Sequence, residues 1–135
     1  MREKLRLSLS EIAKQDVTQN EREAIIELMM MVMYSDKTLK LSEDEAIKEY
    51  TNNIKWESPL SLEFYYGKVT PKIRKALADE ENMNALLEDI NFRIESEIVK
   101  AQVLLVCNDL AMADSDFSSE EKELLTNISK VFQVS

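Results

Sequence analysis

Apolar residues recur at every third or fourth position along most of the chain, which is the period of amphipathic α-helices. The pattern predicts an all-α fold, a single compact bundle of about six to seven helices joined by short loops. The longest predicted helices cover residues 18–34, 42–54, 81–91, 94–113 and 118–132.

Three of these helices begin with the same signature, a capping box. A Ser or Thr lies at the helix N-cap and a Glu lies three residues later, so that each side chain accepts from a free backbone N–H group at the other position. The pairs are Thr18 with Glu21, Ser42 with Glu45, and Ser118 with Glu121.

Proline and glycine divide the middle of the chain. Pro59 follows Ser58 and Pro71 follows Thr70, and proline is favoured at the first helical position after a capping hydroxyl. Gly67 lies between the two pairs, where a glycine typically ends a helix. We therefore predict two short helices here, one ending at Gly67 and one beginning at Pro71.

Segment 94–113 is one of the two most apolar in the chain and is predicted to be a central helix. Its run from Val103 to Cys107 is apolar without interruption, which indicates burial on all sides. The methionine-rich run Met29–Met33 is interpreted as core for the same reason. The residues expected on the inward face of segment 94–113 are Ile94, Ile98, Ala101, Leu105 and Met112.

No linker rich in Gly, Ser or Pro interrupts the 135 residues, so the chain is predicted to form one domain. Residues 18–135 make up the helical domain. Residues 1–17 contain Leu5, Leu7 and Leu9 in a spacing that fits either a short helix or an extended arm.

Composition excludes most catalytic and cofactor motifs. Without histidine the chain has no Ser-His-Asp triad and no histidine metal ligand. The single Cys107 can form neither an internal disulfide nor a thiolate zinc site. One glycine is too few for a phosphate-binding loop or a dinucleotide-binding fingerprint, and also for the tight turns of a β protein.

The formal net charge of −9 indicates which partners fit the chain. Nucleic acid and anionic membrane are disfavoured, because binding to phosphate needs clustered Lys and Arg. Divalent cations or a basic protein surface match this charge. The charged N-terminus lacks a signal-peptide pattern, and the longest apolar run, Leu28–Tyr34, is far too short to span a membrane. We therefore expect a soluble cytoplasmic protein.

Two segments of the chain repeat one pattern. Residues 30–47 and residues 108–125 each contain the end of an apolar helix, an aspartate, a short polar loop, a serine N-cap with acidic residues, and the start of another helix. The two aspartates are Asp36 and Asp114. We interpret the segments as two pseudo-repeated helix hairpins.

The second copy, which reads AMAD at residues 111–114 and SSEE at residues 118–121, resembles the motif of the TerB-like family, named for a tellurite-resistance protein. The first copy, SDK at residues 35–37 and SEDE at residues 42–45, matches more loosely. The resemblance covers about residues 20–132.

In that family a glycine follows the aspartate, whereas this chain has Lys37 in the first copy and Ser115 in the second. The resemblance implies an all-α fold of about seven helices and acidic loops that bind a divalent cation. It also implies an association with stress resistance.

The two acidic loops carry the candidate site. Calcium takes six to eight oxygen ligands and magnesium about six, whereas one loop offers two to four carboxylates, so a good site needs both loops or much water. The alternative is that these residues only start helices, where capping and the helix dipole favour carboxylates. The candidate metal ligands are Asp36, Glu45, Asp114, Asp116, Ser118 and Glu121.

These observations predict a non-enzymatic binding or adaptor module that binds calcium, magnesium or an unknown basic partner through the two loops. One alternative is an enzyme that uses a carboxylate pair, as glycosidases do. Another is a structural subunit that forms a homodimer through an apolar patch. A carboxylate buried in a cleft with a raised pKa favours the enzyme, and the mass in solution separates a monomer from a homodimer.

Overall fold

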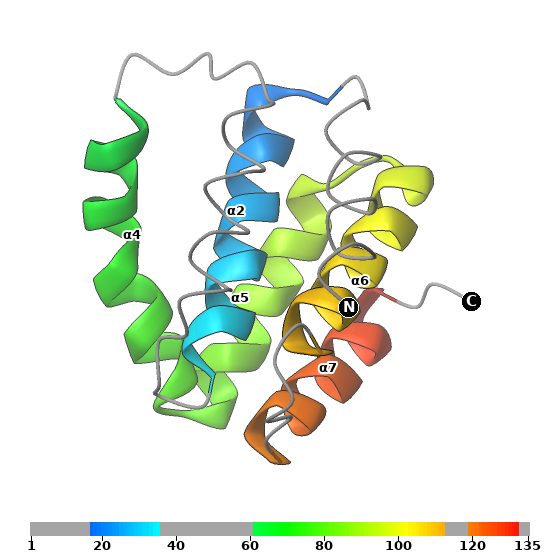
Figure 1. The fold of residues 1–135 in the computed structure, drawn as a ribbon. Coiled ribbons are helices and arrows are strands. Elements are labelled where there is room, and N and C mark those ends of the chain that lie inside the picture. The colour runs from blue at the N-terminus through cyan, green and yellow to red at the C-terminus, as the bar shows by residue number, and fades with distance from the viewer. Residues whose placement is uncertain (1–16, 36–60, 113–118, 133–135) are drawn as a thin grey trace.

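The computed structural model describes residues 17–35, 61–112 and 119–132, and these residues are helical apart from short connections (Figure 1). The all-α prediction is confirmed for them. The predicted helix 42–54 and segment 1–16 lie outside them, so neither the total of six to seven helices nor the pseudo-repeat is tested. The helices are α2 (Gln19–Tyr34), α4 (Leu62–Leu77), α5 (Glu80–Arg93), α6 (Glu97–Met112) and α7 (Ser119–Phe132).

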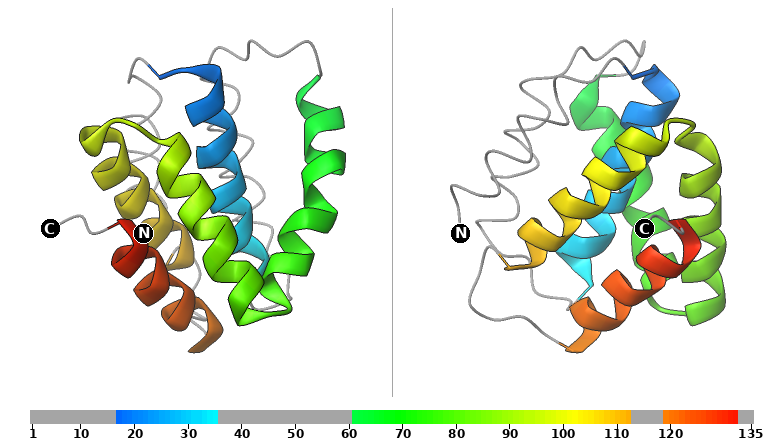
Figure 2. Two further views of the ribbon diagram at one scale, coloured as in Figure 1. Left: turned by 180° about the vertical axis from the view of Figure 1, so that it is seen from behind. Right: turned by 90° about the vertical axis from the view of Figure 1, so that its right-hand side faces the viewer.

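Helix α2 occupies the centre of the described bundle and contacts each of the other four helices. Helix α4 lies on one side of it, and α6 and α7 lie on the other (Figures 1 and 2). Helices α2, α4 and α6 run in one direction, and α5 and α7 run in the opposite direction. The connected pairs α4–α5 and α6–α7 are therefore antiparallel.

The central position of α2 follows from its sequence. Between Ala24 and Val32 the only polar residue is Glu27, and every side chain in this stretch is buried. A helix that is apolar on all sides needs neighbours on every face, and each buried large side chain contributes about 1.5–3 kcal/mol. The interpretation of the methionine run as core is confirmed for Met29, Met30 and Met31.

Side chains at the helix starts confirm one predicted capping box and tie α2 to its neighbours. The Glu21 N–H donates to Thr18 Oγ1 at 3.1 Å, and the Thr18 N–H donates to Glu21 Oε1 at 3.0 Å. The other carboxylate oxygen of Glu21 accepts from the N–H groups of Glu95 and Ser96, at 3.1 and 3.4 Å. The start of α2 is thus fixed against the corner between α5 and α6.

Helix α4 is continuous, so the prediction of two short helices separated by Gly67 is wrong. Pro71 lies inside it, lacks the N–H that would donate to the Gly67 carbonyl, and costs about 3 kcal/mol. Burial of Tyr65, Val69 and Ile73, spaced four residues apart along one face, offsets this cost. The helix changes direction near its middle (Figure 1), as helices with an internal proline do.

Helix α6 begins at Glu97 rather than at residue 94, and it turns a different face to the core from the one predicted. Ile94, which is also predicted to face inward, is buried but lies before the helix. Val99, Val103 and Cys107 are buried, whereas Ile98 and Leu105 are 66% and 48% exposed. The prediction of burial on all sides is also wrong. Among the described helices, α6 packs mainly against α2 and α7, and these two helices cover one stripe of its surface.

The other two helices agree with the predictions. Asp79 caps α5, with its Oδ1 accepting from the Glu81 N–H at 3.1 Å. Helix α7 buries the predicted inward face, which includes Leu124, Ile128 and Phe132.

Candidate functional site

The residues predicted to bind a metal lie almost wholly beyond the described part of the chain. Five of them are outside it: Asp36, Glu45, Asp114, Asp116 and Ser118. Glu121 belongs to the first turn of α7, but its side chain is also outside the description. The metal site and the two capping boxes that share its residues therefore stay predictions.

The helix ends that flank these residues lie at the same end of the bundle. Helix α2 ends at Tyr34, α6 ends at Met112 and α7 begins at Ser119, all at the lower end in Figure 1. A hollow of about 160 Å³ is lined by Ser35, from the end of α2, and Glu123, from the start of α7. Its other lining residues are Leu77, Ala78, Glu80, Met83 and Leu124.

Two of the lining residues are close in sequence to the acidic segments. Segment 36–60 follows Ser35 directly, and segment 113–118 connects α6 to α7. Glu80 and Glu123 contribute two exposed carboxylates to the lining. Within the described ranges no group of three or more Cys, Asp or Glu residues could hold a metal ion. A full oxygen shell there would need ligands from the two segments.

A second cluster, the Glu27 centre, consists of Glu27, Tyr65, Lys72 and Arg93 and joins α2, α4 and α5. Glu27 is only 2% exposed. Arg93 donates to both of its carboxylate oxygens, from Nη1 to Oε2 at 2.9 Å and from Nη2 to Oε1 at 2.7 Å. Lys72 donates from Nζ to Oε1 at 3.0 Å.

The Tyr65 hydroxyl completes the Glu27 centre. It donates to Oε2 of Glu27 and lies 3.2 Å from the backbone oxygen of Glu23. Each carboxylate oxygen of Glu27 therefore accepts from two donors. Arg93 also pairs with the half-exposed Asp89, at 3.0 Å. The buried negative charge is thus surrounded by two positive charges and one phenol.

These contacts fix the protonation states of the Glu27 centre. Burial acts to raise the pKa of Glu27, but hydrogen bonds from Arg93 and Tyr65, with the charge of Arg93, outweigh it and lower that pKa. Burial acts to lower the pKa of Arg93, but Glu27 outweighs it and raises that pKa. Burial and Glu27 together raise the pKa of Tyr65. At neutral pH the Glu27 carboxylate is therefore charged, and Tyr65 keeps its proton.

The sequence analysis missed the Glu27 centre, although one signal was available. Glu27 is the only charged residue between Ala24 and Tyr34. A charged residue on a fully buried helix needs an opposite charge beside it. The pattern could not identify the partners, because Lys72 and Arg93 lie 45 and 66 residues further along the chain.

Cys107 is buried in α6, and burial raises the pKa of its thiol to about 12. The thiolate is the reactive form of cysteine and is scarce at neutral pH when the pKa is this high. This side chain therefore acts as a small apolar group in the core.

Comparison with protein-family models, with curated proteins and with solved structures gives no match to this chain. The similarity to the TerB-like family thus rests on the residue patterns at 35–45 and 111–121. In the part of the chain that the structure describes, no helix has the length and apolar character needed to cross a membrane.

Proposed function

We propose that this protein is a non-enzymatic binding module that binds a divalent cation, calcium or magnesium, where α2 and α6 end and α7 begins. The observation that carries the proposal is the hollow lined by both Ser35 and Glu123. It supports one site shared by the two acidic segments, because one segment follows Ser35 and the other ends where α7 begins. The proposed ligands are Asp36, Glu45, Asp114, Asp116, Ser118 and Glu121.

A shared site explains how segments with few ligands each could bind a cation. Hard divalent cations need about six or more oxygens, and two segments offer that number where one does not. Binding also relieves repulsion between carboxylates in a chain with a net charge of −9. A cation that binds only the folded state stabilises the fold by mass action.

The Glu27 centre supports a binding module over an enzyme. General acid–base catalysis by a carboxyl group is favoured by a raised pKa and needs access to substrate. Glu27 is buried, its pKa is lowered, and both of its oxygens are occupied by donors. Its arrangement is that of a structural ion pair.

The test is a titration of the full chain with Ca²⁺, Mg²⁺ and Mn²⁺, monitored by amide chemical shifts and thermal unfolding. We expect saturable shifts at Ser35 and Glu123 and a raised melting temperature. Asp114→Asn with Asp116→Asn should abolish both effects. The matched control, Glu88→Gln with Glu95→Gln, removes the same charge from exposed positions and should retain both.

Equal loss of the response in the two double variants would overturn the cation site, because the effect would then be general charge screening. The acidic residues would then act as helix caps or as a docking surface for a basic protein. Titration with a basic peptide that shifts the same amide resonances would identify the second of these.

One observation favours the homodimer as a second candidate. Ile98, Ala101 and Leu105 are exposed and share one face of α6, so they form an apolar stripe on the surface. Sedimentation equilibrium would show a dimer for the wild-type chain and a monomer for Leu105→Glu. A monomeric wild-type chain would exclude this candidate.

A further inference from the structure

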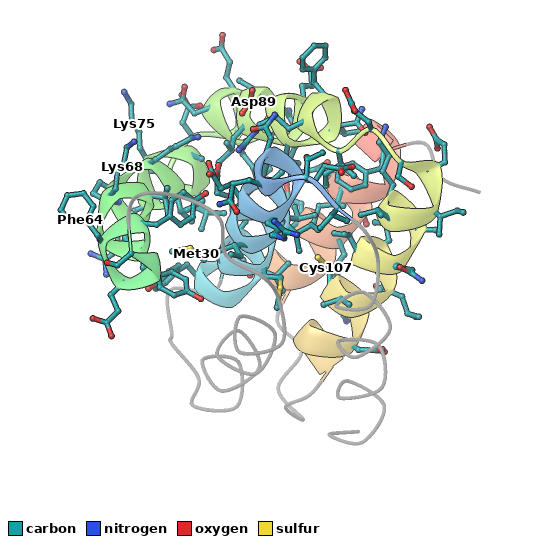
Figure 3. The ribbon with its side chains drawn as sticks, turned by 90° about the horizontal axis from the view of Figure 1, so that it is seen from above. Met30, Phe64, Lys68, Lys75, Asp89 and Cys107 are labelled. Atoms are coloured by element: carbon teal, nitrogen blue, oxygen red, sulfur yellow. The ribbon has the colours of Figure 1, made fainter. Side chains whose placement is uncertain are left out.

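Helix α4 carries a positive stripe in a chain whose net charge is −9. Lys68, Lys72 and Lys75 are spaced by four and three residues and so share one face of the helix. Lys68 and Lys75 are exposed and project on the side of α4 where α5 lies (Figure 3). Neither has an ion-pair partner among the described residues, whereas Lys72 pairs with Glu27.

A groove of about 510 Å³ lies between α4 and α5 beside this stripe. Three of its lining residues are apolar, the buried Ala76 and Leu86 and the exposed Ala85. Lys72 and Lys75 line the groove from α4, and Asn82 and Asp89 line it from α5.

The three charged residues that line the groove are Lys72, Lys75 and Asp89, so the lining carries one net positive charge. Asp89 pairs with Arg93, and Lys72 pairs with Glu27, so these four charges cancel. The charge of Lys75 is left on the groove edge, with that of Lys68 further along α4. An anionic occupant is therefore favoured.

We propose that this groove is a docking site for an acidic amphipathic helix of a partner protein. Apolar side chains of that helix pack on Ala76, Ala85 and Leu86, and its carboxylates pair with Lys75 and Lys68. These two lysines lie seven residues apart, about 10 Å along the helix axis. Carboxylates two turns apart on a partner helix match that separation.

The groove shares no lining residue with the hollow at Ser35 and Glu123. The docking proposal therefore stands or fails independently of the proposed cation site.

The probe for the test is a synthetic amphipathic helix of Glu, Leu and Ala, with a counterpart in which every Glu is Lys. The ¹⁵N-labelled full chain is titrated with each peptide to millimolar concentration. We expect saturable shifts at Ala76, Asn82 and Ala85 with the Glu peptide and none with the Lys peptide.

Variants separate the groove from the general field of the protein. Lys75→Glu should weaken binding about three- to tenfold, because an exposed pair is lost and repulsion replaces it. Lys130→Glu makes the same charge change at an exposed position of α7 and should leave binding within about twofold. Ala85→Leu fills the groove at an exposed helical position and should weaken binding about tenfold. Far-UV circular dichroism checks that each variant is folded.

Four results would each overturn the proposal: no saturable shifts with the Glu peptide, equal binding of the Lys peptide, equal weakening by Lys75→Glu and Lys130→Glu, or shifts away from the groove. It is also overturned if inorganic phosphate or free glutamate produces the same shifts with the same affinity, which defines a small-anion site. Concentration-dependent shifts in the absence of peptide, with a dimer in sedimentation, would instead assign the groove to a second copy of this chain.

Discussion

The two sides of helix α2 are built differently. Towards α4 and α5 the interface contains the Glu27 centre, with a buried carboxylate that accepts from Tyr65, Lys72 and Arg93. The helices on the other side, α6 and α7, bury mainly apolar side chains, among them Val103 and Ile128 with no exposure, together with one carboxylate, that of Asp109.

The apolar side contributes mainly to the stability of the fold, and the charged side contributes mainly to the choice of one helix arrangement. Apolar packing is non-directional and scales with the area removed from water, so the α6–α7 side stabilises the fold but tolerates small shifts of the helices. A buried carboxylate costs several kcal/mol in desolvation, which is offset only when all its donors are in place. We expect the Glu27 centre to fix the register of α2, α4 and α5.

The largest expected effect comes from breaking the charged side. Glu27→Gln leaves the largely buried Arg93 with only the half-exposed Asp89 as a counter-charge and should cost about 3–5 kcal/mol in the free energy of unfolding, measured with urea. Glu88→Gln, at an exposed position of α5, is the control and should change it by less than about 0.5 kcal/mol. A cost below about 1 kcal/mol for Glu27→Gln would mean that Arg93 reaches solvent when its partner is neutral.

Substitutions on the apolar side also test which face of α6 is buried. Ile128→Ala, at a fully buried position of α7, should cost about 2–5 kcal/mol. Leu105→Ala should cost less than about 1 kcal/mol, because that side chain is 48% exposed. If thermal or urea unfolding ranks the two variants in the other order, the face of α6 that contains Leu105 faces the core, as the sequence pattern predicts.

Acid should weaken the Glu27 centre. Because the pKa of Glu27 is lowered in the folded state, the unfolded chain binds more protons as the pH falls below about 4.3, the ordinary value for Glu. The stability that Glu27 contributes is therefore present above pH 4.3 or so and is lost as the pH falls through the lower folded pKa. The gap in unfolding free energy between wild type and Glu27→Gln should narrow over that range, and a constant gap would contradict the lowered pKa.

The smallest expected effect is that of Lys72→Met. The Lys72 side chain is 48% exposed, so solvent screens its pair with Glu27 and the loss should be about 0.2–1 kcal/mol. Lys68→Met, on the same stripe without an ion pair among the described residues, should be close to neutral. A loss of several kcal/mol for Lys72→Met would show that Arg93 does not neutralise Glu27 by itself.

The helices that could be predicted are those with strong local signals. Helix α2 has a capping box and an apolar run, and α7 has a clear inward face, so both agree with expectation. Pro71 and Gly67 are equally clear local signals, but they mislead because burial along α4 outweighs them. The prediction of the inward face of α6 was wrong because both faces are apolar, and only packing against α2 and α7 determines which one is buried.

The candidate sites were less predictable. Glu27 is visible in the sequence as one charge in an apolar run, but its donors come from two other helices and no local pattern connects them. The lysine stripe on α4 is visible from spacing, whereas the groove beside it depends on how α5 packs. The predicted metal ligands stay untested, because they lie in or directly beside the segments outside the described residues.

The single thiol of the chain makes the apolar side of the bundle measurable. Cys107 is buried, and its pKa of about 12 leaves almost no thiolate at pH 8. An alkylating reagent can therefore react with it only when α6 separates from its neighbours. The rate of labelling then measures how often this part of the bundle opens. The measurement requires no engineered cysteine, because the wild-type Cys107 lies on the side of α2 away from the Glu27 centre.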